Sequence, residues 1–168
     1  MSQHTISLIG NPNCGKTTLF NALTGSRQRV GNWPGVTVDK KTGNFSFEGH
    51  DIEVVDLPGI YSVTPTSVSG EDEIVARDYL LSGEAQVVVN IIDASNLERN
   101  LYLTSQLIEM QVPMLVVVNM LDIAKQHKIK LDLAALQKQL GCPVIGLVAN
   151  RNKGIEELKK ALVQFLDF

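Results

Sequence analysis

Long hydrophobic runs are missing from this sequence. Hydrophobic residues make up 44% of the chain, but they fall in short runs, none near the ~18 to 20 consecutive apolar residues that a transmembrane helix needs. The first ten residues also lack a basic segment followed by a long apolar stretch, which is the pattern of a secretory signal. We therefore expect a soluble, cytosolic segment that does not itself insert into a membrane.

Cysteines and clustered basic residues are also scarce. The two cysteines, Cys14 and Cys142, lie too far apart to suggest a disulfide framework or a zinc site, and the three histidines have no spacing typical of a metal site. The formal net charge is -3, and no block of Lys and Arg occurs. This balance weighs against a nucleic-acid-binding domain, so we expect no nucleic-acid partner.

Short apolar runs alternate with segments of helical period along the whole chain. The runs are rich in Ile and Val and read as strands buried on both faces, which indicates an α/β fold with helices on both sides of a mostly parallel sheet. Neither repeats nor linkers occur, so residues 1–168 are expected to form one domain. Strands are expected at 6–9, 52–55, 87–92, 115–118 and 144–147, and helices at 16–24, 71–81, 97–110, 131–140 and 155–168. Alternation of apolar and polar residues across 42–55 predicts a hairpin, hence a six-stranded, three-layer fold with one antiparallel edge strand.

A glycine-rich segment between the first strand and the first helix matches the pattern G-x-x-x-x-G-K-[ST]. Its backbone N–H groups and the helix N-terminus favour a polyphosphate, Lys16 is expected to reach the β- and γ-phosphates, and Thr17 to bind Mg²⁺. A helix N-terminus can also lower the pKa of a neighbouring thiol, so a redox role for Cys14 is an open alternative. The predicted phosphate site comprises Gly10, Asn11, Pro12, Asn13, Cys14, Gly15, Lys16, Thr17 and Thr18.

Two further motifs follow later strands. Asp56 and Gly59 belong to an Asp-x-x-Gly segment, in which the carboxylate can hold Mg²⁺ through water and the Gly59 N–H can meet a γ-phosphate. After the run at 115–118, Asp122 can accept hydrogen bonds from N1–H and the 2-amino group of guanine, a donor pair that adenine lacks. Asn119 is expected to brace the loops. The sequence therefore predicts GTP rather than ATP, and an ATPase is the less favoured alternative.

The order of these motifs resembles that of the small GTPases, whose base-reading motif is usually Asn-Lys-x-Asp. Met120 replaces that Lys and can supply similar apolar cover over the base. Three stretches are similar to the FeoB family of bacterial ferrous iron transporters: Gly-Asn-Pro-Asn-x-Gly-Lys-Thr-Thr-Leu-Phe-Asn at 10–21, Arg-Val-Gly-Asn-Trp-Pro-Gly-Val-Thr-Val at 29–38, and Asn-Met-Leu-Asp at 119–122.

The resemblance implies a Ras-like G domain that hydrolyses GTP to GDP and phosphate. That family continues into a helical regulatory domain and a transmembrane domain, which would be the partners of this segment at the cytoplasmic face of the bacterial inner membrane. It implies that the nucleotide state regulates or powers ferrous iron uptake, with the second switch at 59–78 as the coupling element. The sequence does not determine the oligomeric state.

Further site residues are implied by the same resemblance. Residues 27–38 would form the first switch loop, with Gly35 and Val36 near the nucleotide and Thr37 completing the Mg²⁺ shell. A K⁺ ion would be held by Asn13 and by the carbonyl groups of Gly31 and Trp33, and would take the place of an arginine finger; Arg27 and Arg29 are unsupported alternatives. The base-contacting loop falls at Val148, Ala149 and Asn150, with the Ala149 N–H as donor.

Two readings remain open at this point. The Trp33 indole is expected to anchor the path of the first switch loop, packed on the protein or partly exposed. The alternative is a simple hydrophobic contact under a loop, and the two roles are compatible. Ile60 stands where Ras-like enzymes carry a water-orienting Gln, so slow intrinsic turnover is expected, with switch backbone groups near Thr37 positioning the water. The rival function is a ribosome- or tRNA-associated assembly or modification GTPase, because those families share Asn-rich phosphate loops.

Overall fold

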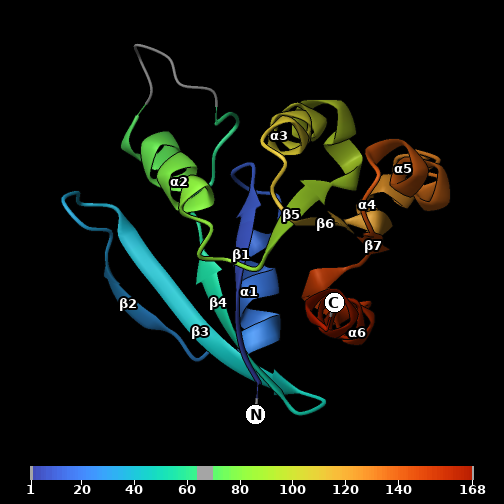
Figure 1. Cartoon of the computed structure of the whole chain (residues 1–168). Coiled ribbons are helices and arrows are strands. Elements are labelled where there is room, and N and C mark those ends of the chain that lie inside the picture. Colours follow the sequence, from blue (N-terminus) through green and yellow to red (C-terminus); the bar gives the residue numbers. More distant parts are fainter. Residues whose placement is uncertain (1, 64–69, 168) are drawn as a thin grey trace.

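A seven-stranded sheet lies at the centre of the computed structural model, which describes residues 2–63 and 70–167 (Figure 1). The spatial order is β2-β3-β4-β1-β5-β6-β7. Pairs β4–β1, β1–β5, β5–β6 and β6–β7 are parallel, whereas β2–β3 and β3–β4 are antiparallel. The strands are β1 (Ser2–Gly10), β2 (Arg29–Asn32), β3 (Asp39–Phe47), β4 (His50–Asp56), β5 (Val87–Asp93), β6 (Met114–Asn119) and β7 (Val144–Gly146).

The extra strand corrects the prediction of six strands with an antiparallel strand at the edge. β2 lies in the segment expected to be a loop, and it forms the edge, so the antiparallel strand β3 is second in the sheet. All four residues of β2 are exposed. Because neither face of β2 is buried, its sequence has no apolar alternation from which a strand could be recognised.

Helices cover both faces of the sheet, which confirms the three-layer α/β arrangement (Figure 1). α1 and α6 pack on one face, and α2, α3 and the α4–α5 pair pack on the other. The helices are α1 (Lys16–Thr24), α2 (Glu71–Ser82), α3 (Leu97–Glu109), α4 (Leu121–Gln126), α5 (Leu133–Leu140) and α6 (Ile155–Leu166), with 3₁₀ turns η1 (Ala94–Asn96) and η2 (Ala149–Arg151).

The buried strands divide their side chains between two cores. In β5, Val87, Val89 and Ile91 face the α1–α6 layer, while Val88 and Ile92 face the α2–α3 layer. This period of two is what a strand covered on both faces requires, and it explains why the sequence showed continuous Ile and Val runs.

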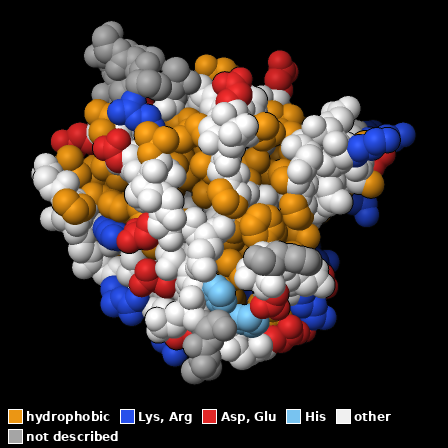
Figure 2. Space-filling model, viewed as in Figure 1, with side chains coloured by type: hydrophobic (Ala, Val, Ile, Leu, Met, Phe, Trp, Pro, Cys, Tyr) orange, Lys and Arg blue, Asp and Glu red, His pale blue; other side chains and the backbone are white. Residues whose placement is uncertain are grey.

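Helix boundaries follow the sequence prediction closely except around residue 121. α4 was not predicted as a separate helix, because it has only six residues and buries only Ala124. No helix in the described ranges combines the length and the apolar character that crossing a bilayer requires. On the face shown in Figure 2, Lys and Arg side chains are dispersed among acidic ones.

Candidate nucleotide-binding site

The predicted phosphate loop joins the carboxyl end of β1 to the start of α1. Two residues in it, Asn13 (φ 68°) and Gly15 (φ 95°), adopt the left-handed conformation that a tight loop of this kind needs. A Cβ on Gly10 would lie 2.7 Å from the Ile91 carbonyl oxygen, so the loop can follow this path only with glycine there. No side chain caps α1. Its first N–H groups therefore point into the loop as donors for an anion.

Lys16 and Asp56 form an ion pair across the site, with 12% and 9% of their side chains exposed. Lys16 is the first residue of α1, after the loop that follows β1, and Asp56 is the last residue of β4. Because β1 and β4 are adjacent parallel strands, the predicted phosphate lysine lies beside the predicted magnesium carboxylate. The neighbouring Thr17 is exposed. A hydroxyl and a carboxylate are the hard oxygen donors that Mg²⁺ prefers, so these residues fit the ion.

The Asp-x-x-Gly segment is bound directly to the phosphate loop. The Ile60 N–H donates to the Gly10 carbonyl (3.0 Å), and the Asn11 side-chain amide donates to the Ile60 carbonyl (3.0 Å). A Cβ on Gly59 would lie 3.2 Å from Pro12 Cα, which shows how closely the two loops approach. Among the described residues, the buried Asn11 Oδ1 has no hydrogen-bond partner. It is thus a buried acceptor that remains available.

Asn119 joins the phosphate loop to the base-reading loop. Its Nδ2 donates to the Cys14 carbonyl (3.1 Å), and its Oδ1 accepts from the Ala149 N–H (3.0 Å). The side chain lies so close to Gly15 that an added Cβ there would collide with Nδ2. One buried amide thereby fixes the relative position of loops that follow β1, β6 and β7.

A cavity of about 480 Å³ opens beside this brace and is lined by Asp122, Val148 and Arg151 among others. The Asp122 carboxylate lies 4.0 Å from Arg151 Nε. Arg151 was not among the predicted site residues, although it directly follows the predicted loop. Met120 starts α4 in the left-handed conformation (φ 62°), and its terminal methyl lies near Gly15.

In the base-contacting loop, the backbone N–H that is free to donate is not the one expected from the sequence. The Ala149 N–H, expected to serve the base, is already donated to Asn119 Oδ1. The Asn150 N–H makes no hydrogen bond within the described part of the chain. In this conformation Asn150, rather than Ala149, therefore offers the available backbone donor.

The predicted first switch forms the β2–β3 hairpin instead of a loop over the phosphate site. Trp33 donates its N–H to the Val38 carbonyl (2.9 Å) and accepts at its own carbonyl from the Val36 N–H (3.3 Å), with Gly35 at φ 76° completing the turn. Gly31 pairs with Lys40 in the sheet. The proposed K⁺ carbonyls are thus committed to the hairpin and do not form an ion site with Asn13 in this conformation.

The Thr37 side chain contacts the start of α2. Its exposed hydroxyl donates to Glu71 Oε2 (3.4 Å) in the first turn of α2. Glu71 was not predicted as a site residue, and nothing local in the sequence indicates this contact across the switch segments.

The Trp33 indole is an anchor packed on the protein. Only 7% of the residue is exposed, and its ring meets Tyr79 of α2 edge to face at 5.4 Å between centroids. Lys40 Nζ lies 4.6 Å from the centre of the Trp33 ring. The side chain therefore joins the turn of the β2–β3 hairpin to α2, which begins within the predicted second switch. Of that second switch, residues 64–69 lie outside the described residues.

The environment of Cys14 disfavours the open alternative of a lowered thiol pKa. The side chain is buried, and desolvation raises its pKa from 9.0 to about 11, which outweighs the favourable interactions with Lys16. The thiolate that redox chemistry needs is therefore disfavoured.

Two histidines that are distant in the sequence are neighbours in the fold. His50 Nδ1 lies 3.3 Å from His4 Nε2, and His50 Nε2 lies 3.3 Å from an Asp167 oxygen. Parallel pairing of β1 with β4 brings them together, so spacing along the chain gave no signal. No group of three or more possible metal-ligating side chains occurs in the part of the chain that the structure describes.

Comparisons with known proteins agree with this geometry. The family profile described as "Ferrous iron transport protein B" matches residues 4–162. The Escherichia coli (strain K12) Fe(2+) transporter FeoB is 57% identical over 166 residues, which cover 98% of this chain but 22% of the transporter. The chain thus spans about a fifth of its curated relative.

Solved structures extend the likeness to three dimensions. The FeoB G-domain from Methanococcus jannaschii superposes with a TM-score of 0.88 at 46% identity, covering 100% of both chains. A GDP-bound variant of S. thermophilus NFeoB gives a TM-score of 0.86 at 47% identity, covering 95% of this chain and 61% of the other. These matches give no support to the ribosome- or tRNA-associated alternative. The chain belongs to the FeoB family of ferrous iron transport proteins and corresponds to its GTP-binding, GTPase-type G domain.

Proposed function

We propose that this domain binds GTP with Mg²⁺ and hydrolyses it slowly to GDP and phosphate. We further propose that its nucleotide state regulates or powers ferrous iron uptake by the membrane domain of a full-length transporter. The observation that carries the proposal is the Asn119 brace, because one buried side chain holds the phosphate loop (3.1 Å) and the base-reading loop (3.0 Å) at a fixed separation. A nucleotide must contact both at once.

Each residue has a role that its position supports. The N–H groups at the start of α1 bind phosphate oxygens, and Lys16 leaves Asp56 to neutralise the β- and γ-phosphates. Thr17 and Asp56 are the residues that would hold Mg²⁺, which supplies positive charge for the phosphoryl group in the transition state. The Gly59 N–H, in the segment that lies beside Pro12, is expected to donate to the γ-phosphate.

Base specificity rests on Asp122 and has a sharp test. The carboxylate would accept two hydrogen bonds from guanine, each worth about 1.5–3 kcal/mol when one partner is charged. Asp122→Asn should therefore weaken GTP binding by roughly a hundredfold or more, since about 1.4 kcal/mol corresponds to a factor of ten. Xanthine carries a carbonyl where guanine has its 2-amino group, so the same variant should bind XTP more tightly than GTP.

The matched control is Asp132→Asn, which alters an Asp that caps α5 away from the cavity. Titration with fluorescent GTP, XTP and ATP would measure the three affinities. Equal GTP affinity in Asp122→Asn and Asp132→Asn would refute the assignment, whereas XTP rescue distinguishes loss of recognition from misfolding.

The K⁺ part of the proposal requires a change of the hairpin. In the structure, the Trp33 carbonyl accepts from Val36 and Gly31 is paired with Lys40, so both residues are engaged in the hairpin. GTP hydrolysis at fixed ionic strength should be faster in K⁺ than in Na⁺, and Asn13→Ala should abolish the difference. Equal wild-type rates in the two salts would remove K⁺ from the mechanism and leave GTP binding intact.

Coupling to transport would run through the second switch into α2. Val63 and Ser62, which precede the undescribed residues 64–69, are held by the Gln106 side chain of α3. The helical and transmembrane domains are the proposed partners. Ferrous iron uptake by the reconstituted full-length transporter should require GTP and fail with Asp122→Asn; nucleotide-independent uptake would refute the coupling.

A further inference from the structure

The outer edge of β3 is paired along only part of its length. β2 pairs with β3 from Asp39 to Thr42, and the pairing with β4 on the other side continues to Phe47. Within the described residues, the β3 edge from Gly43 onward therefore has no neighbouring strand. Exposed strand edges of this kind are sites at which a further strand can add.

The direction of the free backbone groups follows from the hairpin. The bond from the Trp33 N–H to the Val38 carbonyl (2.9 Å) sets the alternation, so even-numbered residues of β3 direct their backbone groups toward β2. Beyond Thr42, the N–H and C=O groups of Asn44 and Ser46 point the same way, where β2 has already ended. Gly43 and Phe45 direct theirs to β4.

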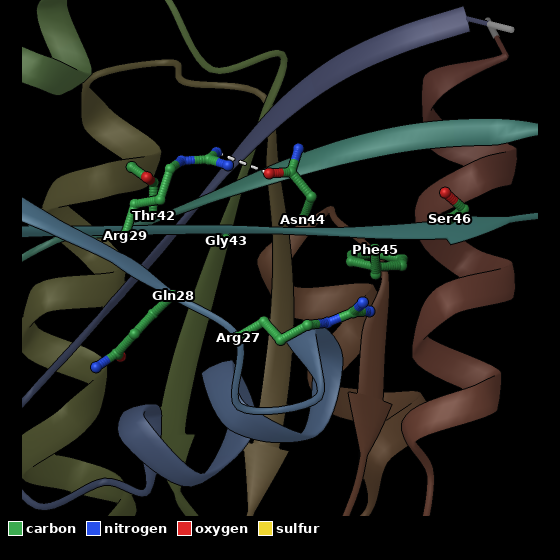
Figure 3. A pocket seen from close by; sticks show the side chains of 8 residues that line it. All are labelled: Arg27, Gln28, Arg29, Thr42, Gly43, Asn44, Phe45 and Ser46. Atoms are coloured by element: carbon green, nitrogen blue, oxygen red, sulfur yellow. Dashed lines mark hydrogen bonds between the residues drawn. The ribbon is translucent and has the colours of Figure 1, made fainter.

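A groove follows this open edge (Figure 3). It has a volume of about 550 Å³ and is lined by residues 27–29 on one side and 42–46 on the other. Figure 3 shows Arg29 and Asn44 on one side of the β3 ribbon, and Arg27 and Phe45 on the other. The groove is thus open to an extended chain lying in line with β2.

Basic side chains lie on both sides of the groove, but on the Arg29 side they are offset by Glu53 and Asp51 of β4, which pair with Asn44 and Ser46. Arg29 is 65% exposed and donates to Asn44 Oδ1 (2.7 Å), with Glu53 at 3.4 Å. The Arg27 guanidinium donates to the Thr24 carbonyl (3.4 Å), and Lys159 Nζ lies 5.3 Å from the Phe45 ring centre. On the α1 side of the edge, two cations thus have no carboxylate partner within the described ranges, which favours an acidic occupant.

We propose that the open half of the β3 edge binds an extended, acidic segment of a separate partner protein. The segment adds to the sheet as a strand, exchanges backbone hydrogen bonds with Asn44 and Ser46, and places a carboxylate beside Arg27. A second copy of this domain fits less well, because pairing two such edges would bring Arg27 and Arg29 of one copy against those of the other. The proposal does not depend on the nucleotide-binding function.

A defined probe is a short, end-blocked peptide of alternating Val and Glu, with a Val and Lys peptide for comparison. Added to the ¹⁵N-labelled domain, the acidic peptide should shift the amide signals of Asn44 and Ser46 and slow their hydrogen exchange. The amides of Gly43 and Phe45, which already bond to β4, should change less. Equal shifts with the Lys peptide, shifts confined to other regions, or no binding at millimolar peptide would each overturn the proposal.

Paired variants separate the backbone and charge contributions. Ser46→Pro removes the outward N–H and should abolish binding, whereas Ser46→Ala keeps that N–H and should bind as wild type. Arg27→Glu should weaken binding at least tenfold, and the matched reversal Lys130→Glu, at an exposed position elsewhere, should change it less than twofold.

Thermal midpoints and GTP affinity would verify that each variant is folded. Unchanged binding by Ser46→Pro would refute strand addition. Concentration-dependent dimerisation that Ser46→Pro abolishes would instead identify a second copy as the occupant, and would overturn the assignment to a separate partner.

Discussion

Replacing Asn119 with Ala should uncouple the two halves of the nucleotide site. The substitution removes both hydrogen bonds of a side chain that is 3% exposed, and it leaves the Cys14 carbonyl and the Ala149 N–H without partners. A buried polar group left unsatisfied costs about 1–3 kcal/mol. Two such groups would cost at most about 6 kcal/mol. Because water can enter the space and partly satisfy them, we expect a loss of roughly 3 kcal/mol in the free energy of unfolding.

Urea denaturation would measure that loss, and nucleotide titration would measure its functional consequence. For a chain of this size the thermal midpoint should fall by roughly 6–12 °C, at about 2–4 °C per kcal/mol. GTP affinity should fall more than tenfold, because the phosphate loop and the base-reading loop no longer have a fixed separation.

Asn90 provides a matched control on the neighbouring strand. It is also buried and makes two hydrogen bonds, donating to the Ile9 carbonyl (3.3 Å) and accepting from the Thr104 hydroxyl (2.6 Å), but it does not touch the base-reading loop. Asn90→Ala should lose comparable stability and retain GTP affinity within about threefold. A loss below 1 kcal/mol in Asn119→Ala, or equal loss of GTP affinity in both variants, would refute the bracing role.

The other predictions concern three buried residues, Cys14, Trp33 and Ile60. Only Cys142 should react with a thiol reagent in the native domain, because Cys14 is buried. The folded state keeps the Cys14 proton to about pH 11, whereas an unfolded thiol loses it near 9.0, so stability should fall across that window by up to about 3 kcal/mol. Cys14→Ala should flatten this decline in alkaline urea titrations. Trp33→Ala should lower the free energy of unfolding by about 3 kcal/mol and speed amide exchange in α2. Trp33→Phe removes an N–H that has no partner among the described residues, so it should lower the free energy of unfolding far less. Equal losses in the two variants would contradict the anchor role. Ile60 is 2% exposed, so Ile60→Gln should lower stability without accelerating hydrolysis, and a tenfold faster rate would show that the position faces the reacting water.

The parts of the site that could be predicted from the sequence are those in which the functional residues and the residues that fix the local backbone conformation lie within a few positions of each other. The phosphate loop needs glycine at positions 10 and 15, a helix start at Lys16, and a strand before it, and the sequence carries all of these within a few residues. Asp122, the residue predicted to read guanine, follows a fully buried strand in the same way. Such motifs can be recognised because their parts are adjacent in the chain.

The features that sequence reasoning missed depend on tertiary contacts. β2 has no buried face, so its only reason to be a strand is its backbone pairing with β3. For Cys14, the local effect of the helix N-terminus is outweighed by burial against the sheet, which reversed the expected direction of its pKa shift. His4 and His50 meet only because β1 and β4 pair in parallel register.

Neutral and charged groups have different tasks in this site. Asn11 and Asn119 tie the loops through amide-to-backbone bonds, and these bonds do not depend on the charge of a ligand. The charged residues pair with one another instead: Lys16 with Asp56, and Asp122 with Arg151. A magnesium nucleotide offers an anion to Lys16 and a cation to Asp56, so binding exchanges the partners of these charges and leaves neither unpaired in a nearly buried position. A nucleotide without its metal would satisfy Lys16 but leave the Asp56 carboxylate beside phosphate, and tight binding is therefore expected to require Mg²⁺.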